Sequence, residues 1–264
     1  MEELMRRLCL FAGYDEENII QDYVVYLIKK LSALSDVFYL GNGKFQSDEL
    51  FKIAPYTKMI YTKKHTLKDF GSWQILISKL GWENISKYDE VVMCNDSVYG
   101  PLCDLDEIFW QMERYNYDFW GITSDYYKTF HIHSYFMVFN QEIIKNQKFQ
   151  NFWENNKSHN STECEYILTT LLTSEGFIGN SFIKNHSNNN ILYEPQKLVN
   201  DYSTPFIKVK SFLPKNPYTA ESSFGIRLKL LTQTNYDINL ISKHIKTAHF
   251  PQTLRQKIAD YVFH

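Results

Sequence analysis

The run Glu90-Val91-Val92-Met93-Cys94 is largely apolar and ends abruptly at Asn95-Asp96-Ser97. A short apolar run that stops at turn-forming residues is typical of a strand buried inside a parallel sheet. Open parallel sheets bind ligands beyond the carboxyl ends of their strands. The stretch therefore predicts a buried central strand and places Asp96 at the ligand-binding edge of the sheet.

Strands and helices alternate on both sides of this run. Besides residues 90–94, apolar runs predict strands at residues 8–11, 36–40, 58–62, 118–122 and 134–140. Helical spacing of apolar residues predicts helices at residues 18–31, 69–80, 105–112, 162–175, 238–245 and 254–262. Such alternation is typical of βαβ units. We therefore predict one α/β domain over residues 1–264, with a mostly parallel sheet flanked by helices.

Composition excludes several classes of protein. The 264 residues are 44% hydrophobic and 22% charged, with few Gly and Pro, which excludes a disordered or fibrous chain. The 28 Lys and Arg nearly balance the 30 Asp and Glu, so we expect no nucleic-acid partner. Residues 205–264, however, carry nine Lys or Arg against three Asp or Glu. This basic tail could meet an anionic partner.

The four cysteines have no CxxC spacing, which favours small buried thiols in a reducing compartment over a disulfide framework or zinc site. The N-terminal residues are too acidic, and their apolar stretch too short, for a secretory signal. No window approaches 18 uninterrupted apolar residues. These features predict a cytoplasmic protein, or one resting on the cytosolic face of the plasma membrane.

Three strand-end loops are candidates for ligand binding: residues 13–15, 63–69 and 95–97. The chain has no GxGxxG after its first strand and no GxxxxGK[ST], so neither a dinucleotide nor a Walker-type phosphate loop is supported. A diphosphate would then need another counter-charge, and a carboxylate holding Mg²⁺ or Mn²⁺ supplies one. Asp96 is placed for this role; the alternative is that it caps the next turn.

Two stretches resemble the central signature of the rhamnan synthesis protein F family: residues 88–90 and residues 94–102. The second stretch reads Cys-Asn-Asp-Ser-Val-Tyr-Gly-Pro-Leu. These are bacterial glycosyltransferases that build rhamnose-containing polysaccharides. Further similar blocks follow the family order at residues 18–24, 69–73, 118–123, 134–136, 149–153 and, more weakly, 205–210. Several ordered blocks at similar spacing are far more specific than any one of them.

The resemblance implies a GT-A-like glycosyltransferase fold in which Asn95-Asp96-Ser97 stands where such enzymes carry an Asp-x-Asp metal motif. Residues 1–125 would form the nucleotide-sugar-binding half, and residues 126–264 the acceptor half with a basic helical tail. The family points to inverting transfer of L-rhamnose, or a related deoxysugar, from dTDP-L-rhamnose. The acceptor would be a saccharide or lipid-linked glycan of a growing bacterial surface polysaccharide, and Asp96 would hold Mg²⁺ or Mn²⁺.

The chain departs from the family pattern at three places. Asn95 is not acidic, which leaves one carboxylate in the motif. Lys63 stands in a lead-in where the family favours Arg, and it lacks the bidentate guanidinium fork. His133 occupies a position where the family more often has Gln before Ser-Tyr-Phe.

Several expected substrate-binding residues also have a structural alternative. Tyr14 and Asp15 would contact base and ribose, or Asp15 would form an Asx turn. Asp69 would bind ribose or base, or cap the helix that follows it. Trp120 would line a sugar cleft, or pack in the core. The full expected substrate-binding set is Ala12, Gly13, Tyr14, Asp15, Lys63, Asp69, Asn95, Ser97 and Trp120.

The expected catalytic residues lie just after the middle of the chain. Asp125 is the preferred general base for the acceptor hydroxyl, with a solvated loop carboxylate as the alternative. His131 and His133 alternate along a predicted strand, so both would face one side and could ligate metal or move a proton, or be structural.

The basic tail includes Lys208, Lys210, Arg227, Lys229, Lys243, His244, Lys246, His249, Arg255 and Lys257. Some would neutralise the donor diphosphate and others would contact anionic lipid, unless they form an ordinary solvated face. The alternative for the whole chain is a non-catalytic nucleotide- or glycan-binding module on the same fold.

Overall fold

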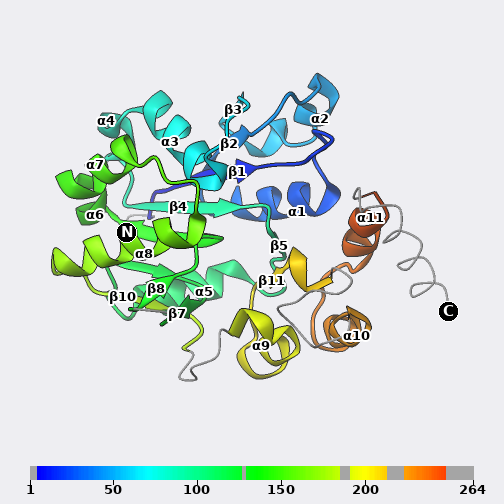
Figure 1. Cartoon of the computed structure of the whole chain (residues 1–264). Coiled ribbons are helices and arrows are strands. Elements are labelled where there is room, and N and C mark those ends of the chain that lie inside the picture. Colours follow the sequence, from blue (N-terminus) through cyan, green and yellow to red (C-terminus); the bar gives the residue numbers. More distant parts are fainter. Residues whose placement is uncertain (1–4, 127–128, 185–190, 213–222, 248–264) are drawn as a thin grey trace.

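The computed structural model describes residues 5–126, 129–184, 191–212 and 223–247 (Figure 1). The predicted helix at residues 254–262 lies outside the described residues, as do His249, Arg255 and Lys257 of the basic tail.

A seven-stranded sheet lies at the centre of the described structure, with its strands in the order β10-β6-β9-β4-β1-β2-β3. Figure 1 labels β10, β4, β1, β2 and β3 of this sheet. The strands are β1 (Arg7–Gly13), β2 (Asp36–Gly41), β3 (Met59–Thr62), β4 (Glu90–Asn95), β6 (Phe119–Gly121), β9 (Phe136–Asn140) and β10 (Gly179–Ser181). Strand β9 is antiparallel to both its neighbours, and the other pairs are parallel. The structure thus confirms the predicted α/β class with a mostly parallel sheet.

The apolar runs lie where burial is greatest. Every residue of β4 is buried, and β1 is buried from Leu8 onward. Because side chains alternate across a strand, Val92 and Cys94 join the core on one face of the sheet, while Val91 and Met93 join the core on the other. The register pairs Ala12 of β1 with Asn95 of β4, so the two strand ends lie side by side.

Helices cover the sheet (Figure 1). They are α1 (Asp22–Leu31), α2 (Ser47–Phe51), α3 (Lys68–Leu80), α4 (Trp82–Ile85), α5 (Leu105–Glu113), α6 (Gln141–Lys145), α7 (Gln147–Asn155), α8 (Ser161–Ser174), α9 (Pro195–Tyr202), α10 (Ser223–Gln233) and α11 (Asn239–Thr247). One core includes apolar residues of α1, α5, α9, α10 and α11, and the other those of α3, α7 and α8. Each face of the sheet thus has its own helical layer.

Helix α1 begins later than its apolar pattern suggests. The sequence predicts a helix from Asn18, but the structure begins it at Asp22. Asn18 has a positive φ of 59°, and its side-chain oxygen accepts the N–H of Lys44. The N–H of Ile19 donates to the Asp15 carboxylate. Residues 18–21 therefore belong to the loop that follows β1.

Two short strand pairs extend the region beyond the carboxyl ends of β4 and β6. Strand β11 (Ile207–Lys208) pairs with β5 (Val98–Tyr99), which brings a segment late in the chain beside the Asn95-Asp96-Ser97 loop. Strands β7 (Ser124–Asp125) and β8 (His131–Ile132) form an antiparallel pair that sets Asp125 opposite His131. Both pairs therefore place polar side chains beyond the sheet.

None of the helices in the described part of the chain combines the length and apolarity that crossing a bilayer requires. The four cysteines are free thiols, and the Sγ atoms of Cys9 and Cys94 lie 3.6 Å apart in the core.

Candidate active site

The loop after β4 is held together by the side chain of Asn95. Its Oδ1 accepts hydrogen bonds from the Ser97 N–H at 3.1 Å and the Ser97 hydroxyl at 2.6 Å. Its Nδ2 donates to Oδ2 of Asp69 at 2.7 Å. The structure therefore brings together Asn95, Ser97 and Asp69, which the sequence placed on two separate strand-end loops.

Asp96 connects this loop with the end of β1. Its Oδ2 accepts the backbone N–H of Tyr14 at 2.5 Å, so its carboxylate does not simply cap the turn that follows it. Burial raises the pKa of Asp96 to about 8, and the nearby carboxylates of Asp69 and Asp15 act in the same direction, while the Tyr14 N–H opposes them. A bound cation would favour the ionised form of this carboxyl.

The loop after β1 has the structural role that the sequence analysis gave as an alternative. Oδ1 of Asp15 accepts the N–H groups of Glu17 and Ile19, and Oδ2 accepts a hydrogen bond from the Gln21 side chain. Asp15 therefore forms an Asx-type turn. Tyr14 is 56% exposed beside Asp96, which leaves its ring free to meet a ligand.

Gly13 allows Tyr39 to pack against the end of β1. A Cβ atom at Gly13 would lie 2.2 Å from the Tyr39 hydroxyl, so a side chain there would displace the ring. Ala12 is buried at the same strand end. Both residues shape the loop that presents Tyr14.

Asp69 lies in the first turn of α3, but no side chain caps that helix. Burial raises the pKa of Asp69, and Lys208 and Lys68 oppose this shift, as does the hydrogen bond from Asn95. The carboxylate points to the Asn95 loop rather than to the backbone of its own helix. Lys63 is exposed in the loop that leads to α3.

Lys208 brings a positively charged side chain to this site. The sequence analysis named it only as one basic residue of the tail. Its Nζ donates to the Ser97 hydroxyl at 2.8 Å and lies 4.5 Å from the centre of the Tyr135 ring. Burial lowers the pKa of Lys208 to about 8, although the carboxylates of Glu165, Asp69 and Asp96 oppose the shift. The signal in the sequence was the weak family block at residues 205–210.

Asp125, His131 and His133 come together beside the same region. One potential ligand atom from each lies within 4.8 Å of those of the other two. The His131 and His133 rings are 5.8 Å apart, and the His133 and Tyr135 rings are stacked at 6.4 Å. Burial lowers the pKa of His133 to about 3, so this imidazole is neutral and weakly basic. His133 is therefore poorly suited to take a proton near neutral pH.

Glu165 is a site residue that the sequence analysis missed. Its Oε1 accepts the N–H of Ser134 at 2.6 Å, and burial raises the pKa of its carboxyl, opposed by the Ser134 hydrogen bonds and by Lys208. The available signal was its place on the buried face of α8, beside Cys164 and Leu168. A carboxylate on an apolar helix face needs a polar partner.

The sequence analysis gave Trp120 two alternative places, the wall of a sugar cleft or the core, and the structure places it in the core. Its side chain is only 3% exposed, so it does not line a cleft. Its ring packs edge-on against Phe109 at 5.3 Å and near Phe136 at 5.9 Å. Trp120 is a core residue because β6 turns this side chain toward the α5 layer.

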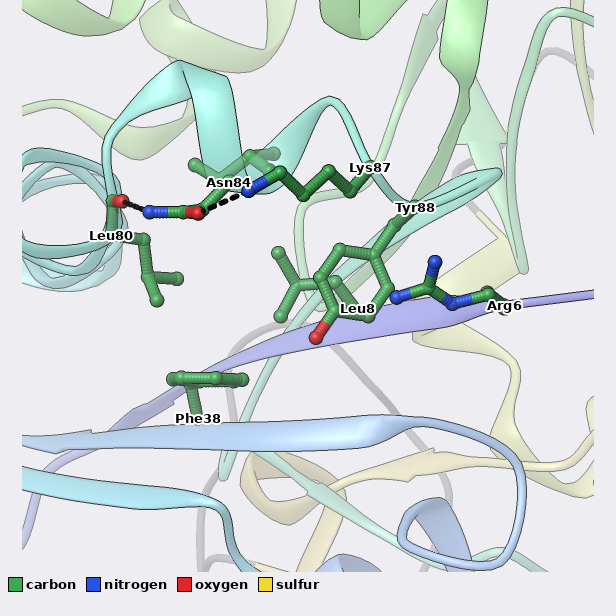
Figure 2. A pocket seen from close by; sticks show the side chains of 8 residues that line it. Arg6, Leu8, Phe38, Leu80, Asn84, Lys87 and Tyr88 are labelled. Atoms are coloured by element: carbon green, nitrogen blue, oxygen red, sulfur yellow. Dashed lines mark hydrogen bonds between the residues drawn. The ribbon is translucent and has the colours of Figure 1, made fainter.

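A cavity of about 240 Å³ lies at the opposite edge of the sheet, beside the start of β1 and β4 (Figure 2). Its polar groups are already paired within the protein. Arg6 stacks on the Tyr88 ring at 5.3 Å, the Tyr88 hydroxyl donates to Asp36, and Lys87 donates to Asn84.

Residues 37–264 match the sequence model of a family described as rhamnan synthesis protein F. The chain belongs to this family. The matched range contains every site residue described above except those at the end of β1 and in the loop that follows it. Protein y4gN of Sinorhizobium fredii, itself described as uncharacterized, is a relative with 24% identity over 223 residues. The match covers 80% of this chain and 54% of that relative, so the chain spans about half of its length.

Among solved structures, the glycosyltransferase GlyE of Streptococcus pneumoniae is similar to this rhamnan synthesis protein F family member with a TM-score of 0.47 and 12% identity. The alignment covers 92% of this chain and 63% of GlyE. A cytidylyltransferase from Leptospira borgpetersenii is similar with a TM-score of 0.41 and 12% identity, over 89% of this chain and 99% of that one.

Proposed function

We propose that the chain is a glycosyltransferase that uses a nucleotide-diphosphate sugar. Membership of the rhamnan synthesis protein F family supports the activity. The observation that carries the proposal is the group of Asp96, Asp69 and Lys208 at the carboxyl edge of the sheet. This edge is where open α/β sheets bind their ligands, and the group carries the charges that a metal-bound diphosphate needs.

The residues present fit a hard divalent cation. Asp96 would hold Mg²⁺ or Mn²⁺ with its carboxylate, and Asp69 supplies the second carboxylate that Asn95 cannot. Such a cation neutralises the charge that develops on the diphosphate as the nucleotide leaves. The raised pKa of Asp96 is consistent with a carboxyl that ionises when a cation arrives.

Lys208 would contact the diphosphate beside that cation. Its ammonium group is a compact point charge that can bind phosphate oxygens. The Ser97 hydroxyl and the Tyr135 ring fix its position in the absence of ligand. Tyr14, Lys63 and the loop residues around them would surround the nucleoside.

The acceptor would be activated from the other side of the sugar. Asp125 would take the proton of the acceptor hydroxyl while the nucleotide leaves from the opposite face, which gives inversion. Family membership supports L-rhamnose or a related deoxysugar as the transferred group, with dTDP-L-rhamnose as donor. The product would be a lengthened saccharide or lipid-linked glycan of a bacterial surface polysaccharide.

We also propose that the chain binds peripherally to an anionic membrane through its basic C-terminal part. Lys243 and Lys246 are exposed on α11 and Lys210 is exposed beside β11. Each Lys near an anionic lipid surface contributes about 1 kcal/mol. Peripheral binding would bring the site close to a lipid-linked acceptor at the cytosolic face.

Thermal unfolding with dTDP, UDP or GDP, each with and without Mn²⁺, tests the donor site. A ligand that binds only the native state raises the melting temperature. We expect the melting temperature to rise most with one of the nucleotides in the presence of Mn²⁺. We expect this rise to be absent in Asp96→Asn. Asp106→Asn, at the exposed start of α5, is the matched control. An equal rise in Asp96→Asn would refute the metal assignment.

Sugar release from dTDP-L-rhamnose and other donors then separates the enzyme from a binding module. Transfer or slow donor hydrolysis that disappears in Asp96→Asn is the result expected of an enzyme. Nucleotide binding without release from any donor, with Mg²⁺ and with Mn²⁺, would favour the non-catalytic module.

A further inference from the structure

We propose that Asp125, His131 and His133 form a second metal site, for a transition cation of the Zn²⁺ type, separate from the Asp96 site. The three residues offer ligand atoms within 4.8 Å of one another, and both histidines are buried. The β7–β8 pairing, with Asp125 opposite His131, places two of the ligands on hydrogen-bonded neighbouring strands.

The donor set decides which cation fits. Two imidazoles and one carboxylate suit Zn²⁺, Co²⁺ or Mn²⁺, whereas Mg²⁺ prefers oxygen alone. With bonds of about 2.0–2.2 Å, ligand atoms on one Zn²⁺ ion are at most about 4 Å apart, so the group needs only a small contraction. Three protein ligands leave a coordination position open, as in catalytic zinc sites.

Hydrogen bonds already orient both imidazoles. Nδ1 of His131 lies 3.3 Å from the Thr129 carbonyl oxygen, and Nδ1 of His133 lies 2.8 Å from the Thr123 hydroxyl. The Thr123 hydroxyl also contacts the Tyr135 hydroxyl at 2.7 Å. Metal-binding histidines commonly use one ring nitrogen in this way, which would leave Nε2 of each ring to bind the cation.

The surrounding charges can accommodate a divalent cation. Asp125 supplies one negative charge directly, and Glu165 lies close enough to His131 and Lys208 to interact with both. The Lys208 ammonium group donates to the Ser97 hydroxyl, and the carboxyl groups of Glu165 and Asp69 lie near enough to interact with it. The Asp125 carboxylate would therefore be the direct counter-charge to an incoming ion.

The inference deepens the proposed function, on which its catalytic consequence rests. A cation on these three residues would lower the pKa of an acceptor hydroxyl bound to it, so that the hydroxyl proton would pass to solvent water as the oxygen bonds to the sugar and the nucleotide leaves. Asp125 would then hold the cation instead of taking that proton itself. Metal binding itself does not depend on the transferase activity, and it can be measured without any donor.

The test uses Co²⁺ as the probe, added to the full chain after chelator treatment and in excess Mg²⁺. Cobalt with nitrogen and oxygen ligands gives visible absorption bands, and calorimetry with Zn²⁺ gives stoichiometry. We expect one tight equivalent in the wild type and at least about tenfold weaker binding in His133→Gln and Asp125→Asn. His159→Gln, an exposed histidine elsewhere, is the control and should bind as the wild type does.

Two further outcomes separate this inference from the proposed function. Asp96→Asn should keep the cobalt spectrum while losing the nucleotide response with Mn²⁺. No visible band in the wild type, or the same spectrum in His133→Gln and Asp125→Asn, would overturn the second site and leave the Asp96 site standing. Circular dichroism of each variant shows whether a lost spectrum reflects a lost fold.

Discussion

Asn95 joins Ser97 and Asp69 through the two ends of one amide. An acidic residue at this position could accept from Ser97 but, when ionised, could not donate to Asp69. The amide therefore holds a carboxyl group of α3 against the loop after β4. In the proposed metal site, Asp69 would take the place of the second acidic residue of an Asp-x-Asp motif.

Asp96→Asn should change how stability depends on pH. The folded carboxyl of Asp96 keeps its proton up to about pH 8, whereas its ordinary pKa is 3.8. Between these values the folded state binds more protons than the unfolded state, so this group makes stability fall as pH rises. We expect the free energy of unfolding of Asp96→Asn to increase relative to wild type from pH 5 to pH 8. Urea titrations without divalent cations measure this, and parallel curves would contradict it.

Lys208→Met should weaken nucleoside-diphosphate binding by about 10–100-fold, since a hydrogen bond to a charged group contributes about 1.5–3 kcal/mol. Affinity in the wild type should also fall as pH rises through about 8, because Lys208 then loses its charge. Isothermal titration over pH 6.5–9 measures both effects. Lys79→Met, exposed on α3, is the control. Unchanged affinity in Lys208→Met would place the phosphates elsewhere.

At the scale of single elements, α3 is fixed to the sheet by Trp73. The indole Nε1 donates to the carbonyl oxygens of Leu10 at 3.0 Å and Cys94 at 3.3 Å. The ring is fully buried and packs edge-on against Phe70 and Trp153. Because α3 also carries Asp69, this contact positions a site residue as well as the helix.

Trp73→Phe should lower the free energy of unfolding by about 1–3 kcal/mol, from two lost hydrogen bonds and the smaller ring. It should also weaken Mn²⁺-dependent nucleotide binding, because Asp69 loses a fixed support. Urea unfolding and calorimetry measure the two effects. Trp110→Phe, 58% exposed on α5, should change neither. Equal stability of both variants would show that packing alone holds α3.

The central elements were predictable because their apolar patterns were clear. The run at residues 90–94 became β4, and the helical spacing at residues 69–80 became α3. The antiparallel direction of β9 was not predicted, since a buried strand has the same pattern in either direction. Lys208 and Glu165 reach the site through β11 and α8. Each residue had a weak signal of its own in the sequence, but no local pattern shows that segments so far apart along the chain meet at one place.

At the scale of the whole molecule, α11, late in the described chain, packs against α1 near its beginning. His244 contacts the Tyr99 hydroxyl through Nδ1 at 2.7 Å, and its ring lies 4.7 Å from that of Tyr23. Tyr23 in turn donates to the Asp96 carbonyl oxygen. The packing of α11 thus reaches the backbone of the site through two aromatic residues.

His244→Gln should make the fold less sensitive to acid. Burial lowers the pKa of His244 to about 4 from its ordinary 6.5. Between these values the unfolded state binds more protons, so His244 makes stability fall as pH drops from 6.5 toward 4. We expect a shallower fall in His244→Gln, measured by urea unfolding at pH 4.5–7. His159→Gln serves as the reference, and identical slopes for both variants would contradict the expectation.

Strand β9 lies between β4 and β6 and is hydrogen-bonded to both. The loop that carries Asp96 and the segment that carries His133 are therefore both attached to neighbouring strands of one sheet. Their relative placement is thus set by the hydrogen bonds of one sheet. In the proposed enzyme, residues 124–133 of another family member could therefore be exchanged into this chain to change acceptor preference, while Tyr135 stays in place beside Lys208.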